Sequence, residues 1–326
     1  MTKQRAITKS RFDEIMRRQL SPGWGAAYQP GIRATVSEAP SASRPAEFWA
    51  ERLGRTVHAL SSIETRAMIL ALWNPALFEL HEQRMLSIVP TLHPLVAHPR
   101  ADGLALAPLQ GTIAVAERLN TLNLHPRMHY VDAKLGRVEI PSPLFGDLLL
   151  FLLDQNGPYC VNWSVKQAEA DFGRSIDLKK RTRDPSKDAA KANARHAIEA
   201  QYYDDADIRT VRVVLNDLPD TLSHNLRVLF LHQRRPDVSG ATEADMIDRL
   251  KAATRMGEPP QGILLSMAAR HGQSIDTLQK LAYHCLWTRK VKVDLFRQSI
   301  FLDRPLQEET IDPFHHYARL FSRGGY

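Results

Sequence analysis

A short, almost wholly apolar run followed by an aromatic and β-branched run is the feature that most constrains the fold of this chain. Residues 143–153 read PLFGDLLLFLL and residues 159–166 read YCVNWSVK, with DQNGP between them. An apolar run of this length bounded by turn residues is typical of a strand buried on both faces. The second run has the composition of its partner strand. We therefore predict a hairpin at the centre of a sheet, closed by a turn at 154–158.

Two charged residues interrupt this apolar pair. Asp147 lies near the start of the first predicted strand, and Lys166 lies at the end of the second. In an antiparallel hairpin the start of one strand lies beside the end of the other, so the two side chains are expected to meet. Charges at the edge of a buried sheet are costly unless they are paired or bind a metal. The sequence therefore predicts either a functional charged site or a structural ion pair at this edge.

The segments before the hairpin predict helices and strands in alternation. Ser61 followed three residues later by Glu64, just before an apolar run, matches a capping box, and Asn74-Pro75 ends the helix that follows. The other expected elements are a helical face with Phe48, Trp49 and Leu53, an extended segment at 55–60, a strand within 77–89, a short helix at 112–122, and edge strands at 128–131 and 138–140.

The segments after the hairpin complete an α/β unit with a mixed sheet, which we expect over residues 45–233. They predict a helix at 187–203, a strand at 208–215 and a helix at 218–232. Beyond a linker, residues 236–326 predict three helices and a strand pair, the pattern of a winged-helix-like domain. Its helices are expected at 241–254, 262–270 and 275–286, and its strands at 290–295 and 298–302. Residues 1–44 are polar and basic and predict a flexible arm.

The charge balance favours a polyanionic partner. The 326 residues include 43 Lys and Arg against 36 Asp and Glu, for a net charge of +7 and a pI near 9.5. Residues 174–195 hold eight Lys and Arg against three Asp. This segment can track DNA phosphates, with Lys179, Lys180, Arg181 and Arg183 as candidate contacts, or it can be a solvated basic face.

Several classes of protein are excluded or disfavoured by composition. The two cysteines, Cys160 and Cys285, are far apart, which excludes a disulfide framework and favours a reducing cytoplasm. No apolar run reaches the roughly 18 residues of a membrane helix, so we expect no membrane partner. The phosphate-loop pattern GxxxxGK[ST] is absent, which leaves nucleotide hydrolysis of that type without support.

Glu64, Asp147 and Lys166 are the residues of this sequence that we expect to form a catalytic site. Two carboxylates with a main-chain carbonyl suit a hard cation such as Mg²⁺, with Mn²⁺ as a substitute. Such an ion polarises a phosphodiester and lowers the pKa of a bound water, and a lysine beside it can position that water or neutralise developing charge. The residues thus predict a metal-dependent nuclease. The alternative for Glu64 is that it only caps its helix.

A set of motifs resembles the TnsA endonucleases of heteromeric cut-and-paste transposons. The resemblance covers about residues 45–230, and its most specific part is the helix ending in Trp-Asn-Pro with the Glu-Gln strand after it. The motifs are LSSIE at 60–64, LWNP at 72–75, ELHEQ at 79–83, GTIA at 111–114, HP at 125–126, GD at 146–147, SVK at 164–166 and IEAQYY at 198–203.

The resemblance implies a restriction-endonuclease-like core and assigns roles within it. Glu64 and Asp147 would hold the metal, the Val165 carbonyl would complete its coordination, and Lys166 would be the catalytic lysine. Glu199 matches a family glutamate with a supporting role near the site. The family often has Gln two residues before the lysine, where this chain has Ser164, whose hydroxyl is a shorter and weaker metal ligand.

The resemblance also implies partners and a reaction. TnsA cuts near the 5′ ends of the transposon, while the DDE-type transposase TnsB cuts the 3′ ends. TnsA contacts an ATP-dependent regulator, TnsC, through its winged-helix-like C-terminal region. A bacterial cytoplasmic protein acting on transposon-end DNA with TnsB-like and TnsC-like partners is therefore expected. The alternatives are a non-catalytic DNA-binding and assembly subunit that retains the nuclease fold, and a restriction enzyme acting alone.

Overall fold

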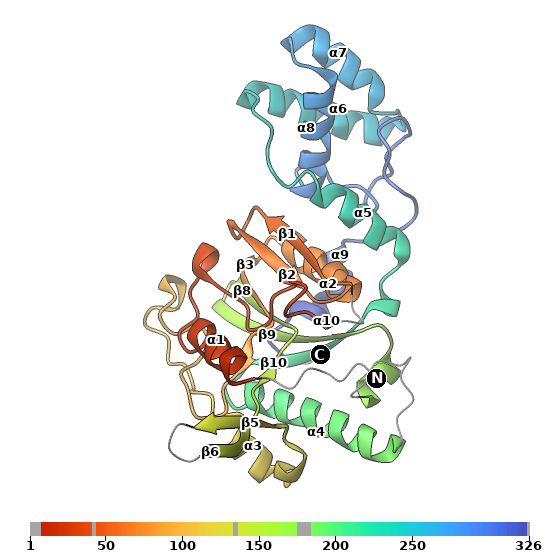
Figure 1. Cartoon of the computed structure of the whole chain (residues 1–326). Helices are drawn as coiled ribbons and strands as arrows, with labels where there is room; N and C mark the ends of the chain where they lie inside the picture. The colour runs from red at the N-terminus through yellow and green to blue at the C-terminus, as the bar shows by residue number, and fades with distance from the viewer. Residues whose placement is uncertain (1–7, 41–43, 133–135, 175–183, 325–326) are drawn as a thin grey trace. The chain divides into compact units, whose positions relative to one another are not determined.

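A computed structural model describes residues 8–40, 44–132, 136–174 and 184–324 of the chain (Figure 1). Contacts between Cα atoms divide the chain into two units, which we call unit 1 (residues 1–68, 76–216 and 319–326) and unit 2 (residues 69–75 and 217–318). This division differs from the expected domains 45–233 and 236–326, because the helix after residue 216 packs in unit 2 and residues 319–326 return to unit 1.

Unit 1 is built on a mixed four-stranded sheet, as the sequence predicts. The strand order is β10-β9-β8-β3, in which β9 and β10 are parallel and the other neighbours are antiparallel. The predicted central hairpin is confirmed, since β8 and β9 pair from Leu148↔Trp163 to Asp154↔Gly157. The strands of this sheet are β3 (Leu77–Glu82), β8 (Leu148–Asp154), β9 (Gly157–Lys166) and β10 (Arg209–Val214).

Residues on both faces of the two central strands are buried, which explains their apolar sequence. Leu149, Phe151 and Cys160 lie on one face, in a core with Ile198 and Tyr202 of α4 (Pro185–Asp204). Figure 1 shows α4 running along this side of the sheet. Val115 of α3 (Thr112–Arg118) joins the same core. Full burial of each large apolar side chain contributes about 1.5–3 kcal/mol, so these contacts fix the position of α4 over the sheet.

Smaller elements surround the sheet in unit 1. Three two-stranded ladders pair β1 with β2, β4 with β7 and β5 with β6, all antiparallel. Helix α2 (Ser62–Trp73) begins in unit 1 and ends in unit 2, where Asn74-Pro75 follows it as predicted. The remaining elements are α1 (Lys9–Gln19), β1 (Ala46–Ala50), β2 (Arg55–Ala59), β4 (Met85–Leu86), β5 (Arg127–Asp132), β6 (Gly136–Pro141) and β7 (Leu144–Phe145), with 3₁₀ turns at Gly25–Ala27, Pro99–Ala101, Leu122–Leu124, Glu169–Gly173 and Leu215–Asp217.

Three sequence predictions for unit 1 are wrong. The predicted helical face around Phe48 is strand β1, because residues 46–50 pair in register with β2 across a turn that contains Gly54 at φ 62°. The predicted single strand at 143–153 is divided into β7 and β8 at Gly146-Asp147. Described residues of the predicted N-terminal arm form α1, and Ile15 and Tyr28 are almost fully buried, so apolar burial outweighs the polar composition there.

Unit 2 consists of packed helices. Helix α8 (Ile275–Trp287) contacts α5 (Asp220–Phe230), α6 (Gly240–Met256) and α7 (Gln261–His271). Two short helices follow, α9 (Pro313–His316) and α10 (Ala318–Phe321), the second of which crosses into unit 1. The helices predicted between 241 and 286 are thus confirmed, with ends that differ by a few residues.

The predicted strand pair at 290–302 does not form, so the expected wing is absent from the described part of unit 2. In its place is a single bridge between Val293 and Glu308. The buried carboxylate of Asp294 accepts the backbone N–H groups of Phe296 and Arg297, at 2.8 and 3.0 Å. This side-chain-to-backbone bonding turns the chain where the β-branched sequence predicts a continuing strand.

Candidate active site

The capping segment of α2 holds Glu64 in place. The Ser61 hydroxyl accepts the Glu64 N–H, and the Glu64 carboxylate accepts the Leu60 N–H at 2.9 Å and the Ser61 hydroxyl at 3.2 Å. These are the reciprocal bonds of a capping box, displaced by one residue on the carboxylate side. A third donor, the Gln83 side-chain amide, lies 3.0 Å from Glu64 Oε2. Glu64 therefore caps its helix and also contacts Gln83, the residue that follows β3.

Asp147 occupies the break between β7 and β8. Its Oδ2 accepts the Val165 N–H of β9 at 2.8 Å, and its main-chain carbonyl accepts the Gln83 N–H at 3.0 Å. Within the described residues, Asp147 Oδ1 accepts no hydrogen bond. The N–H and C=O of one strand residue point to the same side of the strand, so the Val165 carbonyl also faces the Asp147 side of β9. Oxygen atoms of both residues are thereby directed to one edge of the sheet.

Glu64, Asp147 and Lys166 share one electrostatic environment. Burial and, to a smaller extent, the negative charge of Asp147 raise the pKa of Glu64 to about 7, while the positive charge of Lys166 acts in the opposite direction. The structure therefore brings the three predicted residues together. No ion pair joins Asp147 to Lys166 in the described part of the chain, which is contrary to the alternative of a structural pair. Two carboxylates held close in a poorly hydrated place are costly without a cation.

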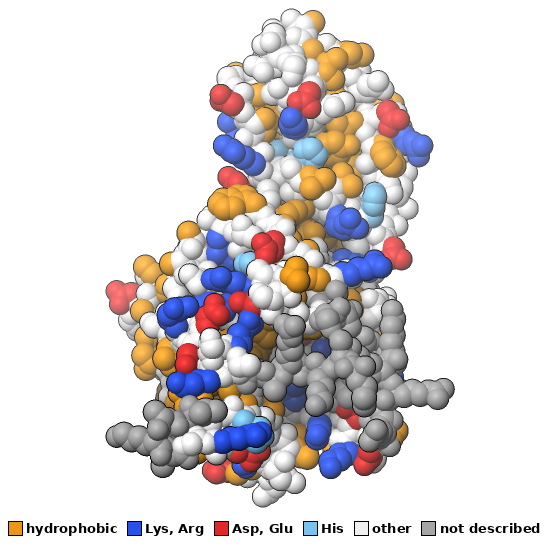
Figure 2. All heavy atoms as spheres, in the orientation of Figure 1, with side chains coloured by type: hydrophobic (Ala, Val, Ile, Leu, Met, Phe, Trp, Pro, Cys, Tyr) orange, Lys and Arg blue, Asp and Glu red, His pale blue; other side chains and the backbone are white. Residues whose placement is uncertain are grey.

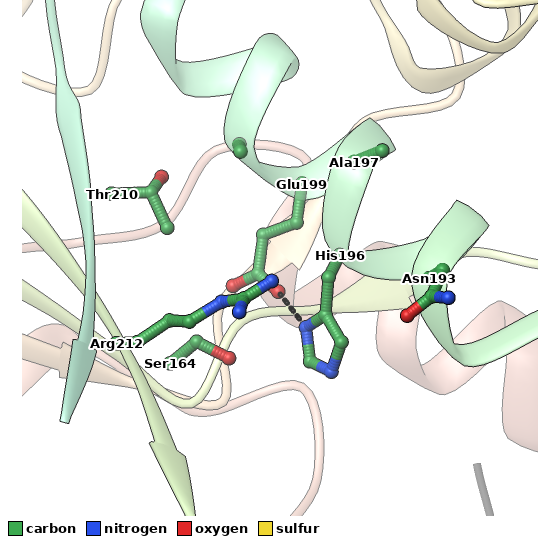
Figure 3. Close-up of a pocket in the computed structure, with 8 residues that line it drawn as sticks. Ser164, Asn193, His196, Ala197, Glu199, Thr210 and Arg212 are labelled. Atoms are coloured by element: carbon green, nitrogen blue, oxygen red, sulfur yellow. Dashed lines mark ion pairs between the residues drawn. The ribbon is translucent and has the colours of Figure 1, made fainter. Parts of the chain in front are cut away.

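Ser164 of β9 and Glu199 of α4 line an adjacent cavity of about 280 Å³. Ser164 is on the same face of β9 as Lys166, because strand side chains alternate. Glu199 of α4 is almost fully buried, accepts the Asn162 side-chain amide at 2.9 Å and lies 3.8 Å from His196 Nδ1. Figure 3 shows His196 from α4 and Arg212 from β10 extending into the cavity around Glu199.

Gly146 lies between Asp147 and the cavity lined by Glu199, and its lack of a side chain allows the two to be close. A Cβ at this position would lie 3.3 Å from Asn162 Oδ1 and 3.5 Å from Glu199 Oε1. The absence of a side chain before Asp147 therefore leaves room for the buried Asn162–Glu199 pair. Glu199 is consequently a neighbour of the Gly146 backbone, and among the described residues its carboxylate bonds to neither Glu64 nor Asp147.

Sequence reasoning assigned no role to Gln83 and Asn162. Asn162 carried a visible signal, since it is a polar residue in the middle of an apolar strand, and its buried Oδ1 has no hydrogen-bond partner among the residues that the structure describes. Gln83 belongs to the ELHEQ motif of the resemblance, but nothing in the sequence indicated its left-handed backbone conformation or its contact with Glu64. The four candidate DNA contacts Lys179, Lys180, Arg181 and Arg183 lie outside the described residues.

Three further observations on the described residues concern metal binding, surface charge and membrane spanning. No group of three or more His, Cys, Asp or Glu side chains among the described residues is arranged to hold a metal ion. On the face in Figure 2, Lys and Arg side chains are interspersed with Asp and Glu. Within the described ranges, every helix is too short or too polar to cross a lipid bilayer.

Comparisons with protein-family models and with curated proteins find no match to this chain.

Proposed function

We propose that this protein is a metal-dependent nuclease whose site is formed by Glu64, Asp147 and Lys166. The observation that carries the proposal is the convergence of two carboxylates from separate elements with a lysine at the end of β9, where burial and mutual repulsion raise the pKa of Glu64 to about 7. Groups whose pKa values are shifted by burial and by specific partners are enriched at functional sites.

The donor set at this edge fits Mg²⁺. The ion is commonly held by one or two protein carboxylates and keeps several waters, so a cluster of three acidic side chains is not required. Glu64 and Asp147 would hold it with the Val165 carbonyl, and Ser164 lies near enough in the strand to act through a water. When bound, the ion would polarise a phosphodiester and lower the pKa of an associated water.

The chain's own residues have separable tasks in this reaction. The Val165 N–H fixes the orientation of the Asp147 carboxylate, and the α2 cap fixes that of Glu64. Lys166 makes no ion pair with a described residue, so its ammonium group is available to position a water or to neutralise charge that develops on the phosphate. A nuclease of this kind releases a 3′ hydroxyl and a 5′ phosphate.

Within that class, we propose a TnsA-like subunit that cuts near the 5′ ends of a transposon. The motifs of the resemblance support it, and the structure gives them consistent positions: LSSIE caps α2, GD lies at the β7–β8 break, SVK ends β9 and IEAQYY covers the sheet from α4. A restriction-endonuclease-like core in unit 1 and TnsB-like and TnsC-like partners belong to the same proposal, with the helices of unit 2 in the place of the expected winged-helix-like domain.

The test is strand-specific cleavage of a supercoiled plasmid that carries the transposon ends, with Mg²⁺ and the partner transposase. Asp147→Ala is expected to abolish 5′-end cleavage while DNA and partner binding persist. Asp204→Ala, at an exposed position of α4 in the same unit, is the matched control and should cut normally. Unchanged 5′-end cleavage by Asp147→Ala would remove the site assignment.

A second candidate is a non-catalytic subunit of the transposition complex that retains this fold. It is favoured by Ser164 in place of the glutamine common in the family. The two candidates differ in metal binding, because an active site should bind Mg²⁺ or Mn²⁺ and raise the melting temperature of the protein. Stabilisation by Mn²⁺ that is lost in Asp147→Ala supports the nuclease, and its absence in the wild type supports the assembly subunit.

A further inference from the structure

Gln83 lies opposite Asp147 in a ladder that is interrupted at this point. The β3–β8 pairing ends at Glu82↔Leu148, and the β4–β7 pairing begins at Met85↔Phe145. The register is the same on both sides of the interruption, so the chain neither gains nor loses a residue there. The Gln83 N–H still donates to the Asp147 carbonyl at 3.0 Å.

The backbone of Gln83 is held in an unfavourable conformation. Its φ is 48°, in the left-handed region, and its side chain is only 4% exposed. A non-glycine residue in this region costs on the order of 1–3 kcal/mol, and such residues cluster at functional sites because the surrounding structure must hold them. Gln83 directly follows the last residue of β3, and its side-chain amide lies 3.0 Å from Glu64 Oε2.

Surrounding contacts hold this conformation. The Gln83 carbonyl accepts the Gly31 N–H at 3.0 Å, and a Cβ on Gly31 would lie only 2.9 Å from that carbonyl oxygen. The preceding Glu82 is completely buried and forms two 2.8 Å hydrogen bonds with Arg55. Gln83 is thus fixed from both sides, and it bonds to both candidate metal-binding residues.

We infer that Gln83 is a positioning residue that sets the Glu64 carboxylate relative to Asp147 for metal binding. This inference rests on the proposed function. Its side-chain N–H holds Glu64 Oε2, and its backbone N–H holds the main chain of Asp147, so one residue fixes two ligands that come from different elements. Groups that orient metal ligands typically change metal affinity by about 10–100-fold when they are removed.

The experiment measures Mn²⁺ binding to the full chain by calorimetry, together with the melting temperature of the metal-free protein. Gln83→Met keeps the length of the side chain and removes the amide donor. Gln19→Met is the matched control, because Gln19 is a buried glutamine of the same unit that bonds to Gln29 and Met85 and makes no bond to Glu64. Gln83→Asn provides a second test, since asparagine tolerates the left-handed region but its amide is one methylene too short to reach Glu64.

Wild type and Gln19→Met should bind Mn²⁺ equally, and both Gln83 variants should bind about 10–100-fold more weakly. Gln83→Asn should keep the metal-free melting temperature, so its loss of affinity cannot come from unfolding. If Gln83→Asn binds as the wild type while Asp147→Ala does not bind, the positioning inference is overturned and the proposed function stands. If the wild type itself binds no Mn²⁺, or if Asp147→Ala binds normally, both are overturned.

Discussion

The indole N–H of Trp163 donates to the main-chain carbonyl of Leu320 at 2.7 Å, across 157 positions of the chain. Trp163 is completely buried in the centre of β9, and the Phe321 ring packs against it with centroids 5.1 Å apart. The Tyr159 hydroxyl on the same strand donates to the Phe321 carbonyl at 2.9 Å. Residues 319–324 thus cover one face of the hairpin that carries Lys166.

This relationship predicts a stability loss for Trp163→Phe. Phenylalanine keeps most of the apolar contact but leaves the buried Leu320 carbonyl without its donor, at an expected cost of about 1–3 kcal/mol. Urea unfolding monitored by far-UV circular dichroism measures the change. Trp49→Phe, at a position 51% exposed, should change stability by less than about 0.5 kcal/mol. Equal effects of the two substitutions would contradict a structural role for the indole N–H.

A glycine before α3 should tolerate no side chain. Gly111 has φ 87°, and a Cβ there would lie 2.5 Å from the Val89 carbonyl carbon. Gly111→Ala is therefore expected to lower the melting temperature by several degrees, because the backbone of residues 88–89 must move. Gly173→Ala is the control in the same unit, where a Cβ meets nothing within 4 Å and φ is not in the left-handed region. A melting temperature unchanged by Gly111→Ala would show that this loop adapts freely.

Buried histidines predict loss of stability in acid. Burial lowers the pKa of His81 well below its ordinary value of 6.5 and lowers that of His93 to about 4. Between pH 6.5 and 4 the unfolded chain binds protons that the folded chain does not, so stability is full above pH 6.5 and falls as the pH decreases.

His81→Phe tests this dependence, because phenylalanine can keep the stacking on Tyr28, whose ring lies 3.8 Å away, and cannot bind a proton. The slope of unfolding free energy against pH between 6.5 and 4 should become shallower by up to about 1.4 kcal/mol per pH unit. The measurement is a series of urea titrations at fixed pH values. A slope equal to that of the wild type would mean that His81 accepts protons in the folded state.

A glutamine at position 164 should strengthen metal binding. The cavity beside Ser164 has a volume of about 280 Å³, which leaves space for a glutamine. Ser164→Gln is expected to raise Mn²⁺ affinity by about tenfold, or about 1.4 kcal/mol. Ala197→Gln adds the same side chain to the same cavity from α4 and should leave the affinity unchanged. An identical response of both variants would mean that the effect comes from filling the cavity.

The sequence predicted the parts of unit 1 that depend on local pattern. The apolar and β-branched runs of β8 and β9 and the capping segment of α2 are strong local signals, and they place Asp147 and Lys166 at one edge of the sheet. The position of Glu199 follows from the parallel pairing of β9 with β10, which brings α4 back over the sheet. The sequence resemblance suggested that position, whereas periodicity alone could not.

The features that sequence reasoning missed depend on contacts between distant segments. The left-handed backbone of Gln83 is imposed by Asp147 and Gly31, which lie far from it in the sequence. Strand β1 is only five residues long, so its pattern does not distinguish a strand from one turn of helix, and only its pairing with β2 decides. The β-branched residues near Val293 predicted a strand, but the side chain of Asp294 turns the chain.

Unit 2 is an insertion, because residues 217–318 separate β10 from the segment that covers Trp163. During synthesis, the ribosome must therefore make this whole stretch before the hairpin can acquire its cover. At about 5–20 residues per second, the interval lasts about 5–20 s. Throughout that time the apolar face around Trp163 has no native partner from residues 319–324, so this face is open to aggregation or to a chaperone while unit 2 is being translated.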